Sequence, residues 1–116
     1  MTAEEKFLQK YIEPGIRRTV ALLRANGFCT FSSCEGGKGH LFERPTIRLY
    51  ADSGRTAAQT RRRLFKVLHS ANYILYVIKE VWHWPVAIDN VIQKAPSVQY
   101  LELEIFVSEE EAMKRR

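Results

Sequence analysis

The feature that most constrains the fold is the alternation of apolar and polar residues in the segment 98–107. Leu101, Leu103 and Ile105 occupy every second position, and Glu102 and Glu104 lie between them. Because successive side chains of a strand point to opposite faces, this alternation predicts a strand with one buried and one polar face. We therefore expect a sheet whose apolar side is covered by helices.

Three segments have the apolar period of a helix. The first spans 3–12, and Pro14 then suits the first turn of a second helix, which the pair Asn26-Gly27 ends. The sequence leaves open whether Pro14 separates two helices or kinks one. The third begins with the capping-box sequence TAAQ at 56–59 and runs to about residue 71. Its buried stripe is expected to contain Ala57, Leu64, Leu68 and Ala71.

Strands are predicted at 28–33, 46–51, 73–83 and 98–107. The segment 87–94 fits a short helix or a strand extension, and 108–116 fits a short terminal helix or a frayed tail. The order helix-strand-strand-helix-strand-strand predicts an α+β domain: a four-stranded, mostly antiparallel sheet with helices on one face. The other face would be polar and partly uncovered, and is expected to present Thr30, Ser32, Cys34, Thr46, Arg48, Tyr50, Glu102 and Glu104.

Length and composition indicate one folded domain over residues 1–116, since the chain is 46% hydrophobic and 27% charged. No apolar run approaches the roughly 20 residues that span a membrane, and the first ten residues are too polar for a secretion signal. Cys29 and Cys34 have an odd spacing, which points them to opposite faces of a strand and favours free thiols. We therefore expect a cytoplasmic protein without a membrane partner.

The stretch SSCEGGKGH at 32–40 is the candidate site. Its glycines permit backbone conformations closed to other residues, and successive exposed amides in such a loop can bind an anion. The expected ligand is an anionic small molecule such as a nucleotide, with phosphate held by the glycine amides and basic side chains, and the ribose or base edge held by Glu35 or His40. The candidate ligand-binding residues are Glu35, Gly36, Gly37, Lys38, His40, Arg44 and Arg48.

An enzyme is an alternative, because Cys34 and His40 could meet across the loop with Glu35 or Glu43 orienting the ring. A small packing residue is the competing and favoured interpretation of Cys34. Structural zinc normally takes four Cys or His ligands, and this stretch offers two. We therefore expect no metal, no cofactor and no catalytic residue.

The net charge of +5 favours an anionic partner. The segment 55–71 concentrates basic residues on one helix side, which makes a nucleic-acid-binding protein the second hypothesis. A solvated helix face is the competing interpretation. The basic residues are Arg55, Arg61, Arg62, Arg63 and Lys66.

Aromatic residues gather in the predicted strand 73–83 and just after it. Tyr73, Tyr76, Trp82 and Trp84 could stack on a nucleobase, but such residues more often fill a core or a subunit interface. Together with the partly uncovered sheet face, they favour a homodimer.

The stretch GFCTFSSCEGGKGHLFERPTIRLY resembles a group of small bacteriophage and prophage proteins, which carries no established activity. The pair Val81-Trp82 and the closing strand 101–106 fit the same pattern, so the resemblance covers roughly residues 16–107. It implies an anti-host role, such as sequestering a host immune signalling nucleotide. The matching loop residues are Thr30, Ser33, Cys34, Glu35, Gly36, Gly37, Gly39, His40, Pro45 and Thr46.

A weaker likeness concerns the segment SSC-x-G, which is similar to the Ser-Ser-Cys-Ser-Gly segment of wybutosine-synthesizing tRNA methyltransferases. Here Glu35 replaces the serine that follows the cysteine, and the rest of that pattern is missing.

Overall fold

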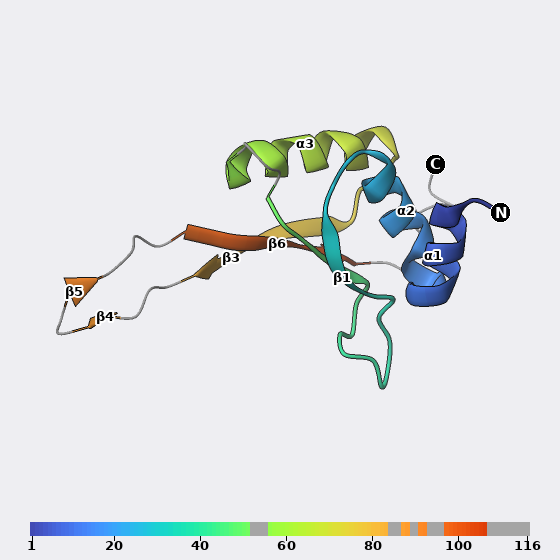
Figure 1. Ribbon diagram of the computed structural model, residues 1–116, viewed down its shortest axis with the longest axis horizontal. Coiled ribbons are helices and arrows are strands. Elements are labelled where there is room, and N and C mark those ends of the chain that lie inside the picture. Colours follow the sequence, from blue (N-terminus) through green and yellow to red (C-terminus); the bar gives the residue numbers. More distant parts are fainter. Residues whose placement is uncertain (52–55, 84–86, 89–90, 93–96, 107–116) are drawn as a thin grey trace.

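The computed structural model describes residues 1–51, 56–83, 87–88, 91–92 and 97–106, which form a sheet with helices on one face (Figure 1). The helices are α1 (Ala3–Tyr11), the 3₁₀ turn η1 (Pro14–Ile16), α2 (Arg17–Ala25) and α3 (Ala57–Ser70). The strands are β1 (Thr30–Cys34), β2 (Thr46–Leu49), β3 (Tyr76–His83), β4 (Ala87–Ile88), β5 (Val91–Ile92) and β6 (Ser97–Ile105). Within the main sheet the order is β1-β2-β6-β3, and every neighbouring pair is antiparallel. The predicted α+β class is confirmed.

Pro14 separates two helices, because η1 intervenes between α1 and α2. The guanidinium of Arg17 donates to the carbonyl of Leu8 at 3.1 Å and to that of Ile12 at 2.8 Å. The Leu8 carbonyl also accepts from the N–H of the C-cap residue Ile12 at 3.0 Å, and Arg17 adds a second donor to this C-terminal end of α1. Arg17 thereby holds the short turn that carries Glu13.

The helix α3 begins where the sequence predicted, with Thr56 as N-cap and a complete capping box. Leu64 and Leu68 are fully buried, as expected. Thr60 is also fully buried, whereas Ala57 and Ala71 are only half-buried. The buried side of α3 therefore includes Thr60. Its hydroxyl donates to the carbonyl of Thr56 at 3.2 Å, so this polar group is buried together with a hydrogen-bond partner.

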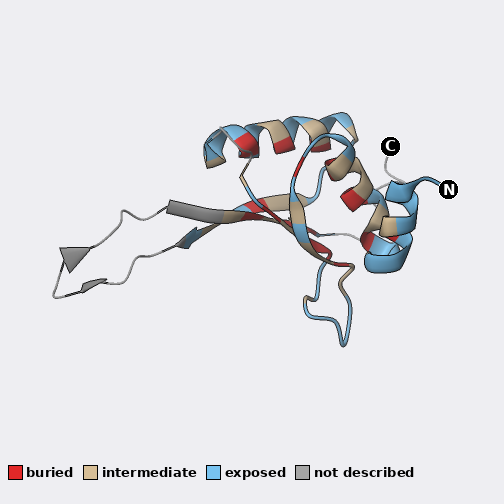
Figure 2. Cartoon of the chain, in the orientation of Figure 1, coloured by how far each residue is buried: buried red, intermediate tan, exposed pale blue. Residues whose placement is uncertain are grey.

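The core lies between the helices and the covered face of the sheet, and Figure 2 shows the buried residues on the facing sides of both layers. The helical layer contributes Ile16, Val20, Leu23, Leu64 and Leu68, and the sheet contributes Ile47, Leu49, Leu101, Leu103 and Ile105. All ten side chains are at most 1% exposed. Burial of the alternating residues of β6 confirms the prediction made from their spacing.

The composition of the opposite, open face differs from the prediction at three positions. A register shift between Thr30 and Ser32 pairs Thr30 with the core residue Leu49. Phe31 instead stacks on Tyr50, with ring centroids 4.3 Å apart. Cys34 and Thr46 lie in the expected register but are buried. Thr30 leaves the open face because the irregularity shifts the alternation of side chains along β1. Cys34 and Thr46 contact the loop that joins β1 to β2, since the Thr46 hydroxyl donates to the Arg44 carbonyl at 2.8 Å and the Cys34 sulfur lies within 4.8 Å of a His40 ring nitrogen.

The strands β3 and β6 form a long antiparallel pair, beyond which β4 and β5 pair with each other (Figure 1). The segment 87–94 therefore contains two short strands, and not the helix that was one of its two predicted forms. The predicted turn at 52–54, Trp84 and the terminal helix at 108–116 lie outside the described residues.

Other sequence predictions concern thiols, aromatics and partners. Cys29 is exposed, Cys34 is buried, and both are free thiols, as expected. Tyr73 packs in the core, while Trp82 is 44% exposed. Among the described residues, no helix has both the length and the apolar character to cross a membrane. The homodimer stays a prediction.

Candidate functional site

The loop between β1 and β2, which carries the predicted site, lies on the side of the sheet opposite α3 (Figure 1). It bends sharply at Gly36, where φ is +81°. A Cβ atom at this position would lie 2.6 Å from the carbonyl carbon of Arg44 and from the nitrogen of Pro45. Two parts of the loop thus approach so closely that only glycine fits.

Two of the amides predicted to bind an anion already have partners in the loop. The Gly36 N–H donates to Cys34 Sγ at 3.4 Å, and the Gly37 N–H donates to the Glu43 carbonyl at 2.9 Å. These bonds close the loop on itself. The glycines therefore serve first to shape the backbone, and the anion-binding role of this loop stays a prediction.

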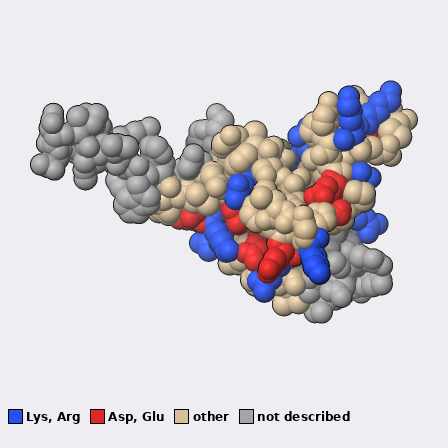
Figure 3. All heavy atoms as spheres, turned by 90° about the horizontal axis from the view of Figure 1, so that it is seen from below, with Lys and Arg blue, Asp and Glu red and all other residues tan. Residues whose placement is uncertain are grey.

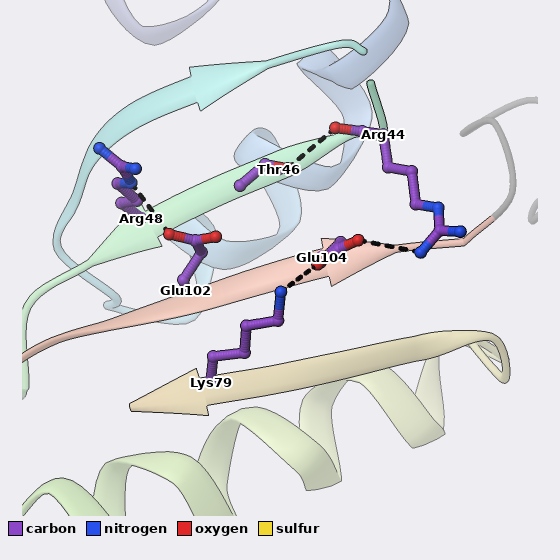
Figure 4. A network of polar contacts seen from close by, with 6 residues as sticks. All are labelled: Arg44, Thr46, Arg48, Lys79, Glu102 and Glu104. Atoms are coloured by element: carbon purple, nitrogen blue, oxygen red, sulfur yellow. Dashed lines mark hydrogen bonds and ion pairs between the residues drawn. The ribbon is translucent and has the colours of Figure 1, made fainter. Parts of the chain in front are cut away.

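The basic side chains of the predicted site form ion pairs across the open face (Figure 4). Arg44 Nη1 lies 3.1 Å from Glu104 Oε1, and Arg48 Nε lies 3.1 Å from Glu102 Oε2. Lys79 Nζ completes the network at 2.6 Å from Glu104 Oε2. Figure 3 shows basic and acidic groups side by side on this face, so each of these three cations already has a carboxylate partner.

Lys38 is the exception among the predicted phosphate-binding side chains. It is exposed, and in the part of the chain that the structure describes it has no acidic partner. One lysine at a loop tip is a weak anion site, because a surface ammonium is well hydrated and its field is screened by salt.

The ion-pair network predicts a pH effect at Glu104. The hydrogen bond from Lys79, and then that from Arg44, holds the pKa of this carboxyl below its ordinary value. A carboxyl with a lowered pKa stabilises the fold above the pKa of the unfolded chain, and that contribution is lost as the pH falls through the folded-state pKa. An NMR titration should therefore place the Glu104 midpoint below that of an unperturbed glutamate.

Lys79→Met should raise the Glu104 midpoint, because it removes the largest cause of the shift. Lys38→Met removes a lysine outside the network and should leave the midpoint unchanged. Equal midpoints in wild type and Lys79→Met would show that the ion pair does not form in solution.

A second cluster of side chains with potential metal-ligand or catalytic groups consists of Glu13, Cys34 and His40. One ligand-type atom from each, a carboxylate oxygen, the thiol sulfur and a ring nitrogen, lies within 4.8 Å of the other two. Cys34 and His40 thus meet across the loop as the enzyme hypothesis required. The carboxylate beside the ring belongs to Glu13, whose Oε2 is 3.2 Å from His40 Nδ1, and not to Glu35 or Glu43.

Glu35 has another role, in which its backbone and side chain face the turn before α2. Its N–H donates to Glu13 Oε1 at 3.0 Å. Its side chain lies so close to Gly15 that a Cβ on that glycine would be 3.0 Å from Glu35 Cβ. The sequence did not indicate Glu13, because a glutamate before a proline is a common helix-end residue and its partners lie more than 20 positions away.

A groove of about 460 Å³ lies between α3 and β3, which is an edge strand of the sheet. Arg61 and Arg62 are exposed on the helix side, and in the described ranges neither has an acidic partner. Phe65 is 54% exposed beside them, 6.4 Å from the Tyr76 ring between centroids. The groove is lined by Ala58, Arg61, Arg62, Phe65, Tyr76, Val77 and Ile78.

The remaining basic residues of the predicted nucleic-acid face behave differently from one another. Arg63 donates to the Asn26 carbonyl at 2.6 Å and lies over the Phe28 ring, so it braces α3 against the end of α2. Lys66 is exposed but lines a separate hollow with residues of α2. Arg55 lies outside the described residues. The basic run is therefore divided, and of its described members Arg61 and Arg62 border the α3–β3 groove.

No protein-family model matches this chain, and searches of curated proteins and of solved structures give no significant match.

Proposed function

We propose that this protein binds an anionic aromatic ligand, a nucleotide unit, in the α3–β3 groove. The observation that carries the proposal is the placement of Arg61 and Arg62 beside an apolar groove with a half-exposed phenyl ring. This keeps the ligand class expected from the sequence but moves the site from the glycine-rich loop to the basic helix. We place the site on the helix because Arg44 and Arg48, the arginines expected to bind phosphate at the loop, are already paired with glutamates on the open face.

Three properties of the groove fit such a ligand. Its volume lies within the range of roughly 300–1,000 Å³ that is usual for small-molecule sites. An exposed Phe65 offers a surface for base stacking. Burial raises the pKa of the Tyr76 hydroxyl, which therefore stays neutral and can donate a hydrogen bond.

The nucleotide bound in the groove can come from two sources. It can be a free nucleotide, as the resemblance to phage proteins implies, or one residue of a single-stranded nucleic acid. We would titrate the protein into fluorescently labelled oligo-dT and oligo-U over a range of salt, and test mononucleotides as competitors and by calorimetry. Strand binding with a steep salt dependence would identify nucleic acid. Tight mononucleotide binding with little gain from a longer strand would identify a free nucleotide.

Phe65→Ala should weaken binding by about 1–3 kcal/mol, the usual value of one base–aromatic stack. The double variant Arg61→Gln/Arg62→Gln should weaken binding at least as much and reduce its salt dependence, because two phosphate-neutralising groups are lost. Affinity is read from the anisotropy midpoint.

The charge-matched control is Lys6→Gln/Lys10→Gln, which removes two exposed positive charges from α1. Lys38→Gln tests the glycine-rich loop. Weakening by either control to the same extent as Arg61→Gln/Arg62→Gln would contradict the groove, and a dominant effect of Lys38→Gln would return the site to the loop. Absence of binding to every strand and mononucleotide would overturn the proposal altogether.

A further inference from the structure

The Glu13, Cys34 and His40 cluster lies on the other side of the sheet from the α3–β3 groove and requires its own explanation. Three chain segments meet there: the turn before η1, the end of β1 and the glycine-rich loop. A carboxylate oxygen, a thiol sulfur and an imidazole nitrogen come within 4.8 Å of one another. These are three of the side-chain ligand types that proteins use for transition metals.

Backbone amides hold two of these groups in place. The Glu35 N–H donates to Glu13 Oε1 at 3.0 Å, which leaves Oε2 facing His40. The Gly36 N–H donates to Cys34 Sγ at 3.4 Å and so fixes the position of the sulfur. Both donors are in the loop, so the tight bend at Gly36 serves to aim amides at the cluster.

The sulfur of the cluster is more buried than its imidazole and carboxylate. Cys34 is only 5% exposed, whereas the side chains of His40 and Glu13 are 34% and 40% exposed. An ion can therefore approach from the side of the imidazole and carboxylate and meet the sulfur at the bottom. A cysteine nucleophile, in contrast, needs a partly exposed sulfur that the substrate can reach.

We propose that Glu13, Cys34 and His40 form a zinc site. Zn²⁺ accepts sulfur, nitrogen and oxygen together, at about 2.3 Å from sulfur and about 2.0–2.2 Å from nitrogen and oxygen. Mg²⁺ and Ca²⁺ prefer oxygen ligands only and do not suit a thiolate. Since tetrahedral zinc has four ligands, three protein ligands leave one position for water or for an exogenous ligand.

The test uses the full chain, freed of metal with a chelator and then titrated with Co²⁺ and with Zn²⁺ against a chelating dye. We expect one equivalent of metal and, with Co²⁺, a thiolate-to-cobalt charge-transfer band that Zn²⁺ abolishes. Saturating Zn²⁺ should raise the melting temperature by roughly 5–15 °C, because the ion binds only the folded chain.

Variants separate the proposed ligands from the rest of the chain. Cys34→Ser should remove the charge-transfer band, and Cys29→Ser, the matched control at the other cysteine, should retain it. Glu13→Gln and His40→Gln should each weaken Zn²⁺ binding at least roughly tenfold. Both side chains are partly exposed, so these variants test the site even where loss of the buried Cys34 thiol disturbs folding.

Three results would overturn the proposal. The first is Zn²⁺ affinity that is equal in wild type and Cys34→Ser. The second is unchanged affinity in both Glu13→Gln and His40→Gln. The third is a metal-free protein that binds no Zn²⁺ while Cys34 reacts rapidly with iodoacetamide, which would assign the cluster to a thiol nucleophile instead.

Discussion

Replacing Leu103 with alanine is expected to lower the free energy of unfolding by about 2–5 kcal/mol. Leu103 is fully buried on β6, an inner strand of the sheet, in register with Ile47 on one side and Ile78 on the other. Because neighbours on both sides are fixed by strand pairing, the surrounding residues cannot collapse into the space left behind. The cost is then the lost transfer free energy plus that of a residual cavity.

Urea denaturation followed by circular dichroism measures this effect. Since small domains are stable by only about 5–15 kcal/mol, the midpoint of Leu103→Ala should fall markedly. The matched control is Leu41→Ala, the same substitution at a loop position that is 80% exposed. A difference of less than about 1 kcal/mol between the two variants would contradict the placement of Leu103 in the core.

Gly36→Ala is expected to have the second largest effect, a loss of about 2–4 kcal/mol of stability. One part of this cost is the positive φ of +81°, which places Cβ too close to the backbone of its own residue. The other part is a contact of 2.6 Å between the new Cβ and the backbone at Arg44 and Pro45. Backbone cannot rotate away as a side chain can, so the loop must open.

Gly39→Ala is the matched control for Gly36→Ala. Its φ is +84°, but beyond Gly39 and its two chain neighbours no atom lies within 4 Å of a Cβ placed there. It should therefore show the conformational cost alone, about 1–2 kcal/mol. Urea denaturation gives the loss of stability of each variant. The loss in Gly36→Ala minus that in Gly39→Ala is the cost of the contact with the backbone at Arg44 and Pro45. Equal losses would mean that this close approach does not exist in solution.

Local signals in the sequence were sufficient for the main elements of the fold. The period of two in 101–105 predicted which residues of β6 are buried, because strand geometry alone assigns alternate side chains to alternate faces. The capping-box sequence at 56–59 predicted the start of α3, because that motif is complete within four residues. Neither inference needed knowledge of a distant partner.

Local signals failed where a distant segment decided the outcome. A one-residue register irregularity moved Thr30 off the open face and put Phe31 there, although nothing in the residues of β1 marks it. Arg44 and Arg48 were expected to meet phosphate, but β6 places Glu104 and Glu102 directly beside them. The opposite charges come from a strand more than 50 positions away, so their pairing could not be inferred from the loop.

The sequence by itself determined the main helices and strands, the alternating core residues of β6 and the glycine-shaped loop, since each depends on residues close together in the chain. Tertiary structure decided which chemistry each region presents. It brought Glu13 to Cys34 and His40, and it set Arg61 and Arg62 beside an apolar groove at the sheet edge. The physical reason is that charge balance, metal ligation and cavity formation depend on distances in space, which sheet topology sets and local sequence does not encode.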